Sequence, residues 1–202
     1  MSSHHTQEDH HLQAISKGGV IESIHNKVLS VRQLLAIEQL AIPGYQRPYR
    51  WGTKNIADLF TDLAIHQKKS GYRLGSFVFH QHSSTEETLD IVDGQQRTLT
   101  LMLTVKALID RLDEDNQNSK KQAIRFTRHD LRQQLEALRA PLHAFMTRQH
   151  FRSQDSDVNL RRNYVELRRR VSRPEFDEQQ IDFLLNRCEV VCFVLHNISE
   201  AF

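Results

Sequence analysis

The chain has 202 residues, 27 Lys and Arg against 25 Asp and Glu, and a formal net charge of +2. This length allows one large domain or two small ones, and 10 Phe, 4 Tyr and 1 Trp supply core anchors that exclude wholesale disorder. The longest apolar run, Val190 to Leu195, is far below the roughly 20 residues of a membrane helix. The polar N-terminus lacks a secretory apolar region, so we expect a cytoplasmic protein with no membrane partner.

Residues 1–20 are expected to form a flexible tail, because they are polar and His-rich. Apolar spacing of three and four predicts a helix over residues 30–40, with Ser30 as its N-cap, and a second helix over residues 53–69. Gly71 follows the second helix as a stop signal.

Four β-rich segments predict a small mixed sheet, with the second and third segments forming a hairpin or a neighbouring pair. The expected strands lie near residues 41–47, 74–80, 88–92 and 189–196. A strong helix is predicted over residues 94–112, with apolar residues on several sides, and a polar loop over 113–122. Asp177 opens a further helix, with Gln180 three residues later as a capping box.

The segment from Lys120 to Arg173 has a helical pattern and is strongly basic. It holds 14 Lys and Arg against 5 Asp and Glu, a local charge of +9, whereas the remainder of the chain has a charge of −7. Such a segment can bind DNA, but solvated Arg-rich helix surfaces explain it as well, and composition alone favours that explanation.

These patterns give an α/β (α+β) fold in four segments. They are a flexible tail (1–20), a motif-bearing core (21–115), a helical basic segment (116–187), and a returning strand followed by the start of a helix (188–202). Because Ser199 looks like an N-cap only three residues before the chain stops, we expect the N-terminal part of a longer protein.

The two cysteines, Cys188 and Cys192, lie four residues apart in an expected strand, a spacing that is poor for a disulfide. We interpret them as buried thiols of a reducing compartment. A zinc site would need two more ligands at suitable spacing, and the sequence has none near these cysteines.

The first candidate site is the segment Ile42 to Trp51, IPGYQRPYRW, which its prolines hold extended. In an extended chain alternate residues share a face. Tyr45, Arg47, Tyr49 and Trp51 would then offer three aromatic planes and a guanidinium, a combination that can stack on a base and pair with phosphate. Packing of the aromatic rings on the core is an equally good interpretation.

The second candidate site is the segment Asp93 to Arg97, DGQQR, at the point where a strand gives way to a helix. A helix N-terminus is a natural phosphate site. Gly94 allows close approach, Gln95 and Gln96 can donate amide hydrogen bonds, and Arg97 can bind phosphoryl oxygens. Alternatively, Asp93 and Gln96 form a capping box that needs no ligand.

Together these segments resemble the N-terminal domain of GmrSD-type modification-dependent restriction systems. The resemblance rests on I-P-x-Y-Q-R-x-Y-x-W, L-G-S-x-V and I-V-D-G-Q-Q-R-x-x-T-L, which begin here at Ile42, Leu74 and Ile91. One departure is Thr98-Leu99-Thr100, where the family often has Leu-Thr-Thr.

The resemblance implies a ParB/sulfiredoxin-like fold and a role in bacterial anti-phage defence. It implies an NTPase domain that binds a nucleoside triphosphate (GTP or ATP) with Mg²⁺ and controls a C-terminal HNH-type nuclease domain. The resemblance places the phosphate-handling motif on Asp93, Gly94, Gln95, Gln96 and Arg97, and the paired residues of the first motif on Gln46 and Arg47. From the chemistry of the residues, Tyr49 and Trp51 are further nucleotide-binding candidates that could stack on the base, and Asp93 is the candidate Mg²⁺ ligand. Asp93 and Gln96 are the candidate catalytic residues.

Two other functions stay open on sequence alone. The domain could be a non-catalytic module that binds DNA or senses its modification, through its basic helices or a partner domain, and it could form a homo-oligomer. Thiol chemistry of the sulfiredoxin type is disfavoured, because no cysteine lies near the DGQQR segment. The histidines His129, His143 and His150 are expected on the surface rather than in a nuclease site.

Overall fold

The computed structural model describes residues 26–81, 88–117, 126–148 and 154–195. The expected flexible tail, His150 and the expected N-cap Ser199 lie outside these ranges. The strands are β1 (Lys27–Ser30), β2 (Leu40–Ala41), β3 (Tyr72–His80), β4 (Leu89–Asp93) and β5 (Cys188–Leu195). The helices are α2 (Val31–Leu35), α3 (Thr53–His66), α4 (Gln95–Gln117), α5 (His129–Ala137), α6 (Arg139–Thr147), α7 (Gln154–Val171), α8 (Glu178–Asp182) and the π-helical turn η2 (Phe183–Arg187).

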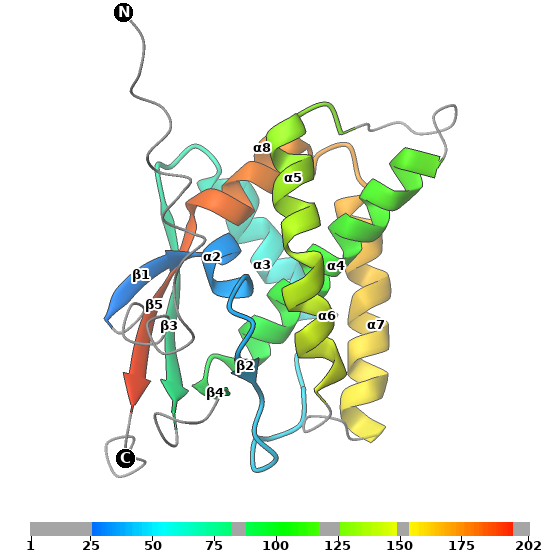
Figure 1. Cartoon of the computed structure of the whole chain (residues 1–202). Helices are drawn as coiled ribbons and strands as arrows, with labels where there is room; N and C mark the ends of the chain where they lie inside the picture. The colour runs from blue at the N-terminus through cyan, green and yellow to red at the C-terminus, as the bar shows by residue number, and fades with distance from the viewer. Residues whose placement is uncertain (1–25, 82–87, 118–125, 149–153, 196–202) are drawn as a thin grey trace, which may run out of the picture.

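The five strands form one mixed sheet in the order β1-β5-β3-β4-β2, which confirms the α+β class. β3 is parallel to β5 and antiparallel to β4, while β1 is antiparallel to β5 and β2 is parallel to β4. The described helices lie on one side of this sheet (Figure 1). Burial alternates along β5 accordingly, because successive side chains of a strand point to opposite faces.

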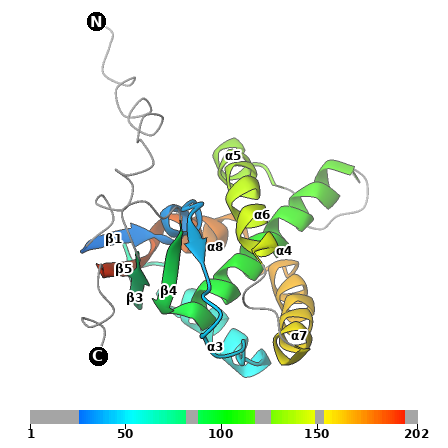
Figure 2. The same ribbon diagram turned by 60° about the horizontal axis from the view of Figure 1, so that its bottom comes forward.

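Helix α4 is the centre of the helical layer. Figure 2 shows it running outward from the end of β4, between α5 and α6 on one side and α7 on the other. The sequence predicted this helix as far as residue 112, but it continues to Gln117. The acidic last turns, expected as a loop, are held by arginines of later helices: Asp113 pairs with Arg139 at 2.5 Å, and Asp115 pairs with Arg132 at 2.7 Å.

The basic segment is helical, as expected, but much of its charge is neutralised within the fold. The arginines with carboxylate partners are Arg128, Arg132, Arg139, Arg168, Arg169 and Arg170. Arg132, Arg139 and Arg168 pair with carboxylates of α4 and so link helices, whereas Arg169 and Arg170 pair with Glu166 inside α7. The local charge of +9 is therefore not a uniform basic surface.

Three local expectations were wrong in their extent or detail. The helix expected over 30–40 is only Val31–Leu35, although the Ser30 capping box is present, with Gln33 N–H donating to Ser30 Oγ at 3.2 Å. The strand expected over 41–47 is only Leu40–Ala41. Asp177 caps α8, but the side chain of Gln180 donates to Gln67 at 2.9 Å instead of reaching back to the cap.

No helix among the described residues is long and apolar enough to cross a membrane. The short strand β1 was not among the predicted strands; it pairs with β5 from Lys27 to Ser30.

Both cysteines lie in β5 on its buried face, as expected of structural thiols. Burial raises the pKa of Cys188 and of Cys192 to about 12.

Because only the thiolate is nucleophilic, we expect neither thiol to react with Ellman's reagent at mildly alkaline pH in the folded protein. Both should react after unfolding in urea. Rapid labelling of the folded chain would show that β5 is less protected than this packing indicates.

Candidate functional site

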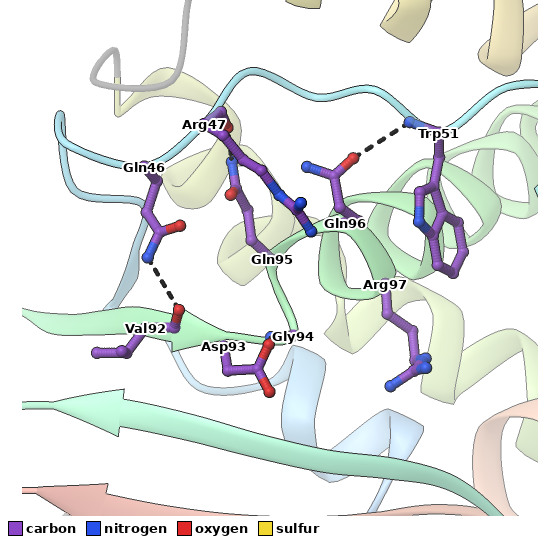
Figure 3. Close-up of a pocket in the computed structure, with 9 residues that line it drawn as sticks. All are labelled: Gln46, Arg47, Trp51, Val92, Asp93, Gly94, Gln95, Gln96 and Arg97. Atoms are coloured by element: carbon purple, nitrogen blue, oxygen red, sulfur yellow. Dashed lines mark hydrogen bonds between the residues drawn. The ribbon is translucent and has the colours of Figure 1, made fainter. Parts of the chain in front are cut away.

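A cavity of about 370 Å³ lies where the loop after β2 passes over the end of β4 and the first turn of α4. Figure 3 shows its lining residues, which come from two segments far apart in the sequence. They are Gln46, Arg47, Trp51, Val92, Asp93, Gly94, Gln95, Gln96 and Arg97. The structure therefore brings eight of the nine site residues named from the sequence to one cavity; the exception is Tyr49.

Side-chain amides of the DGQQR segment hold the loop in place. Gln96 Oε1 accepts from the backbone N–H of Arg50 at 2.7 Å and of Trp51 at 3.2 Å, and Gln96 Nε2 donates to Pro48 O at 3.2 Å. Gln95 Nε2 donates to Arg47 O at 3.0 Å. The two sequence segments thus bind each other before any ligand is considered.

The expected shared face of Tyr45, Tyr49 and Trp51 does not exist, because this stretch is an irregular loop in which strand alternation fails. Tyr49 is 1% exposed, and its hydroxyl lies 2.8 Å from Thr100 Oγ1 and accepts from Asn163 Nδ2 at 3.0 Å. Burial raises the pKa of the Tyr49 phenol. Tyr45 is 62% exposed and does not line the cavity, so Trp51 is its one aromatic residue.

Helix α7 supplies a set of contacts that sequence reasoning missed. Ser156 Oγ accepts from Tyr49 N–H at 3.0 Å, Asn159 Nδ2 donates to Tyr49 O at 3.0 Å, and Asn163 Nδ2 donates to Trp51 O at 2.6 Å. The spacing of these three residues places them on one face of α7. That polar spacing is the signal in the sequence that could have indicated these contacts.

The carboxylate of Asp93 accepts from Gly94 N–H at 2.8 Å and is exposed to the cavity. The alternative interpretation, a capping box of Asp93 with Gln96, is wrong, because the Gln96 amide is hydrogen-bonded to the loop. This contact pattern also fails to support Gln96 as a catalytic group, since its oxygen and nitrogen both have backbone partners. The second carboxylate oxygen of Asp93, in contrast, has no hydrogen bond to the backbone among the described residues.

Gly94 makes the turn from β4 into α4, with a φ of +93° that disfavours other residues. A Cβ at this position would lie 2.5 Å from Cδ1 of Phe77. The first backbone bond inside α4 runs from Thr98 N–H to Gly94 O at 2.8 Å. The preceding N–H groups of the first turn have no intrahelical acceptor, and they form the positive end of the helix dipole.

Arg97 projects from the first turn of α4 toward β3. Its guanidinium lies 5.8 Å from the centroid of the Phe77 ring and next to Gly75, where an added Cβ would come within 2.6 Å of Nη1. Within the described ranges neither Arg97 nor Arg47 has a carboxylate within salt-bridge distance. With Asp93 as the single acidic residue of the lining, the cavity carries a net positive charge.

No group of three or more potential metal ligands occurs among the residues that the structure describes. A cation here would therefore depend on Asp93 together with oxygens of a ligand and water. His129 and His143 are exposed on α5 and α6, as expected, and line no part of the cavity.

The family model for the N-terminal domain of the GmrSD restriction endonuclease matches residues 28–202 of the chain. A search of curated proteins found no match. The match covers every described strand and helix except the first residue of β1, and it includes all nine residues that line the cavity.

The amide contacts of Gln96 predict a role in stability. Gln96→Met removes three hydrogen bonds to the loop, and each bond contributes about 1 kcal/mol. We expect the free energy of unfolding in urea to fall by about 2–3 kcal/mol. Gln179→Met, at an exposed position of α8, is the matched control and should change little. Equal stability of the two variants would contradict the structural role.

Proposed function

The chain belongs to the GmrSD restriction endonuclease N-terminal domain family, and we propose that its cavity binds and hydrolyses a nucleoside triphosphate. Membership makes the chain a module of a restriction, or host-defence, protein. The proposal concerns what this module contributes, and it rests on the chemistry of the cavity.

The observation that carries the proposal is the convergence of Arg47, Arg97 and the first turn of α4 on one cavity. Guanidinium groups pair with phosphate oxygens through two parallel hydrogen bonds, and N–H groups at a helix start attract anions. Because the arginines have no carboxylate partners among the described residues, their charge is available to a ligand.

Asp93 fits the role of a Mg²⁺ ligand. Mg²⁺ in nucleotide sites is commonly held by one or two carboxylates together with phosphate oxygens and water, and the cavity offers one exposed carboxylate. When bound, Mg²⁺ would neutralise charge on the phosphates. Asp93 itself would orient that ion or an attacking water, while Arg47 and Arg97 stabilise the charge of the transferring phosphoryl group.

Trp51 is the residue that we assign to base stacking, because its half-buried ring lines the cavity. Tyr49, proposed for the same role from sequence, instead holds the loop against α4 and α7. A nucleotide bound beside Trp51 would therefore contact a loop whose backbone is already fixed.

In the full-length protein, we propose that occupancy of this site controls a C-terminal nuclease domain. The loop makes this possible, because it joins the ligand cavity to α7 through Tyr49 and Trp51. DNA contact by the basic helices has weaker support, since most of their arginines are paired with carboxylates. Arg161 and Arg162, exposed on α7, are the better candidates for such contact.

The Arg97→Ala variant tests the triphosphate site. We expect ATP, GTP, CTP or UTP with Mg²⁺ to raise the melting temperature of the wild-type chain, because a ligand of the folded state stabilises it. Loss of a bidentate phosphate contact should weaken binding by about 30-fold or more, or about 2 kcal/mol. Arg161→Ala removes the same charge from α7 and is the control. Equal nucleotide affinity of Arg97→Ala and wild type would overturn the assignment.

Gly75→Ala tests the position of Arg97 without changing a residue of the cavity lining. Gly75 has a φ of +139°, and an added Cβ would collide with the Arg97 guanidinium. We expect nucleotide affinity to fall several-fold as the guanidinium moves, measured by calorimetry. Gly44→Ala is the matched control, since nothing lies within 4 Å of its added Cβ. Unchanged affinity in Gly75→Ala would show that Arg97 needs no support from β3.

A further inference from the structure

The cavity contains a buried acceptor that phosphate binding does not use. Gln95 is 5% exposed, and its Oε1 has no hydrogen-bond partner among the described residues. Its orientation is fixed, because Nε2 must be the atom that donates to the carbonyl of Arg47 at 3.0 Å. A buried acceptor without a donor costs about 1–3 kcal/mol, so a donor from water or a ligand is expected to satisfy it.

The side-chain amide of Gln46 is likewise oriented by a hydrogen bond to a backbone carbonyl. Its Nε2 donates to the carbonyl of Val92 at 2.9 Å, which turns Oε1 away from β4. In the view of Figure 3 the amide oxygens of Gln46 and Gln95 are turned toward each other. Both residues line the cavity that Arg97 also lines.

The cavity is therefore chemically divided. The arginines and the first turn of α4 offer positive charge and N–H donors, which suit phosphate oxygens. The two amide oxygens offer only lone pairs and would repel phosphate, so they require an O–H or N–H group of the ligand.

We propose that Gln46 and Gln95 recognise hydrogen-bond donors of the nucleoside, and thereby select a nucleoside triphosphate over bare polyphosphate. The inference rests on the proposed triphosphate site. The donors of a nucleoside are its ribose hydroxyls and the N–H groups of its base, and both can donate a hydrogen bond to the amide oxygens of Gln46 and Gln95.

Arg47 connects the two parts of the cavity. In Figure 3 its side chain runs beside that of Gln95 toward Gln96, and Gln95 Oε1 is shielded from solvent. Because Gln95 Nε2 donates to the carbonyl of Arg47, the residue that would bind phosphate and the amide that would accept the nucleoside donor are held together, so one ligand can reach both.

The test compares inorganic tripolyphosphate with nucleoside triphosphates, each with Mg²⁺, by calorimetry on wild type, Gln95→Met and Gln46→Met. We expect each variant to weaken nucleoside triphosphate binding about 5- to 10-fold, the value of one hydrogen bond of about 1 kcal/mol. Tripolyphosphate affinity should change less than about 2-fold. Each variant also loses a bond to a backbone carbonyl, that of Arg47 for Gln95→Met and that of Val92 for Gln46→Met. Gln46→Met leaves the Arg47 contact in place, and melting temperatures without ligand report any loss of folding in either variant.

Deoxynucleoside triphosphates and the set of four bases identify the source of the donor. Discrimination against the deoxy sugar that disappears in the variants assigns the hydroxyls, and discrimination among bases that disappears assigns the base. Equal losses for tripolyphosphate and nucleotide, or no loss for either, would overturn donor recognition alone. Failure of tripolyphosphate and nucleotides to bind the wild-type chain would overturn the triphosphate site itself.

Discussion

The hydrogen bonds between the amides of Gln95 and Gln96 and the backbone of the loop from Arg47 to Trp51 are the contacts on which the site depends. Pro43 and Pro48 lack N–H donors, which makes this segment a poor partner for a strand. Its peptide groups still need partners when they are covered. Side chains from the first turn of α4 provide them, so the loop is fixed over the helix N-terminus where a ligand would bind.

Helix α4 connects this site to the rest of the molecule. Its first turn forms the floor of the cavity, and its middle is buried between the sheet and the other helices. Its last turns place Asp113 and Asp115 against arginines of α5 and α6. Helix α7 contacts both α4 and the loop, through Asn163 in particular. A change in the position of the loop on ligand binding would therefore be transmitted to α7, which gives the proposed control of a partner domain a physical route.

The site and the surface differ in how they use arginine. Arg132 and Arg139 are paired with carboxylates and stabilise the packing of helices. Arg47 and Arg97 have no such partner within the described ranges, and Arg97 is held by the face of Phe77 instead. A guanidinium positioned by an aromatic ring keeps its hydrogen-bond donors free, which is the condition that phosphate recognition requires.

The sequence by itself determined which segments form the cavity, because a strand-to-helix turn with Gly94 and a proline-rich aromatic loop are local patterns. It also predicted most strands and helices from their periodicity. Only the tertiary structure decided the roles within the site. Tyr49 is a core residue whose hydroxyl accepts from Asn163, 114 positions away in the sequence, so no local pattern could reveal its role. The Gln96 amide is hydrogen-bonded to the loop backbone, which is also a contact between distant segments. The same holds for the exposed charge of the basic segment. A count along the chain gives +9, but the ion pairs that neutralise part of it depend on which side chains meet in space.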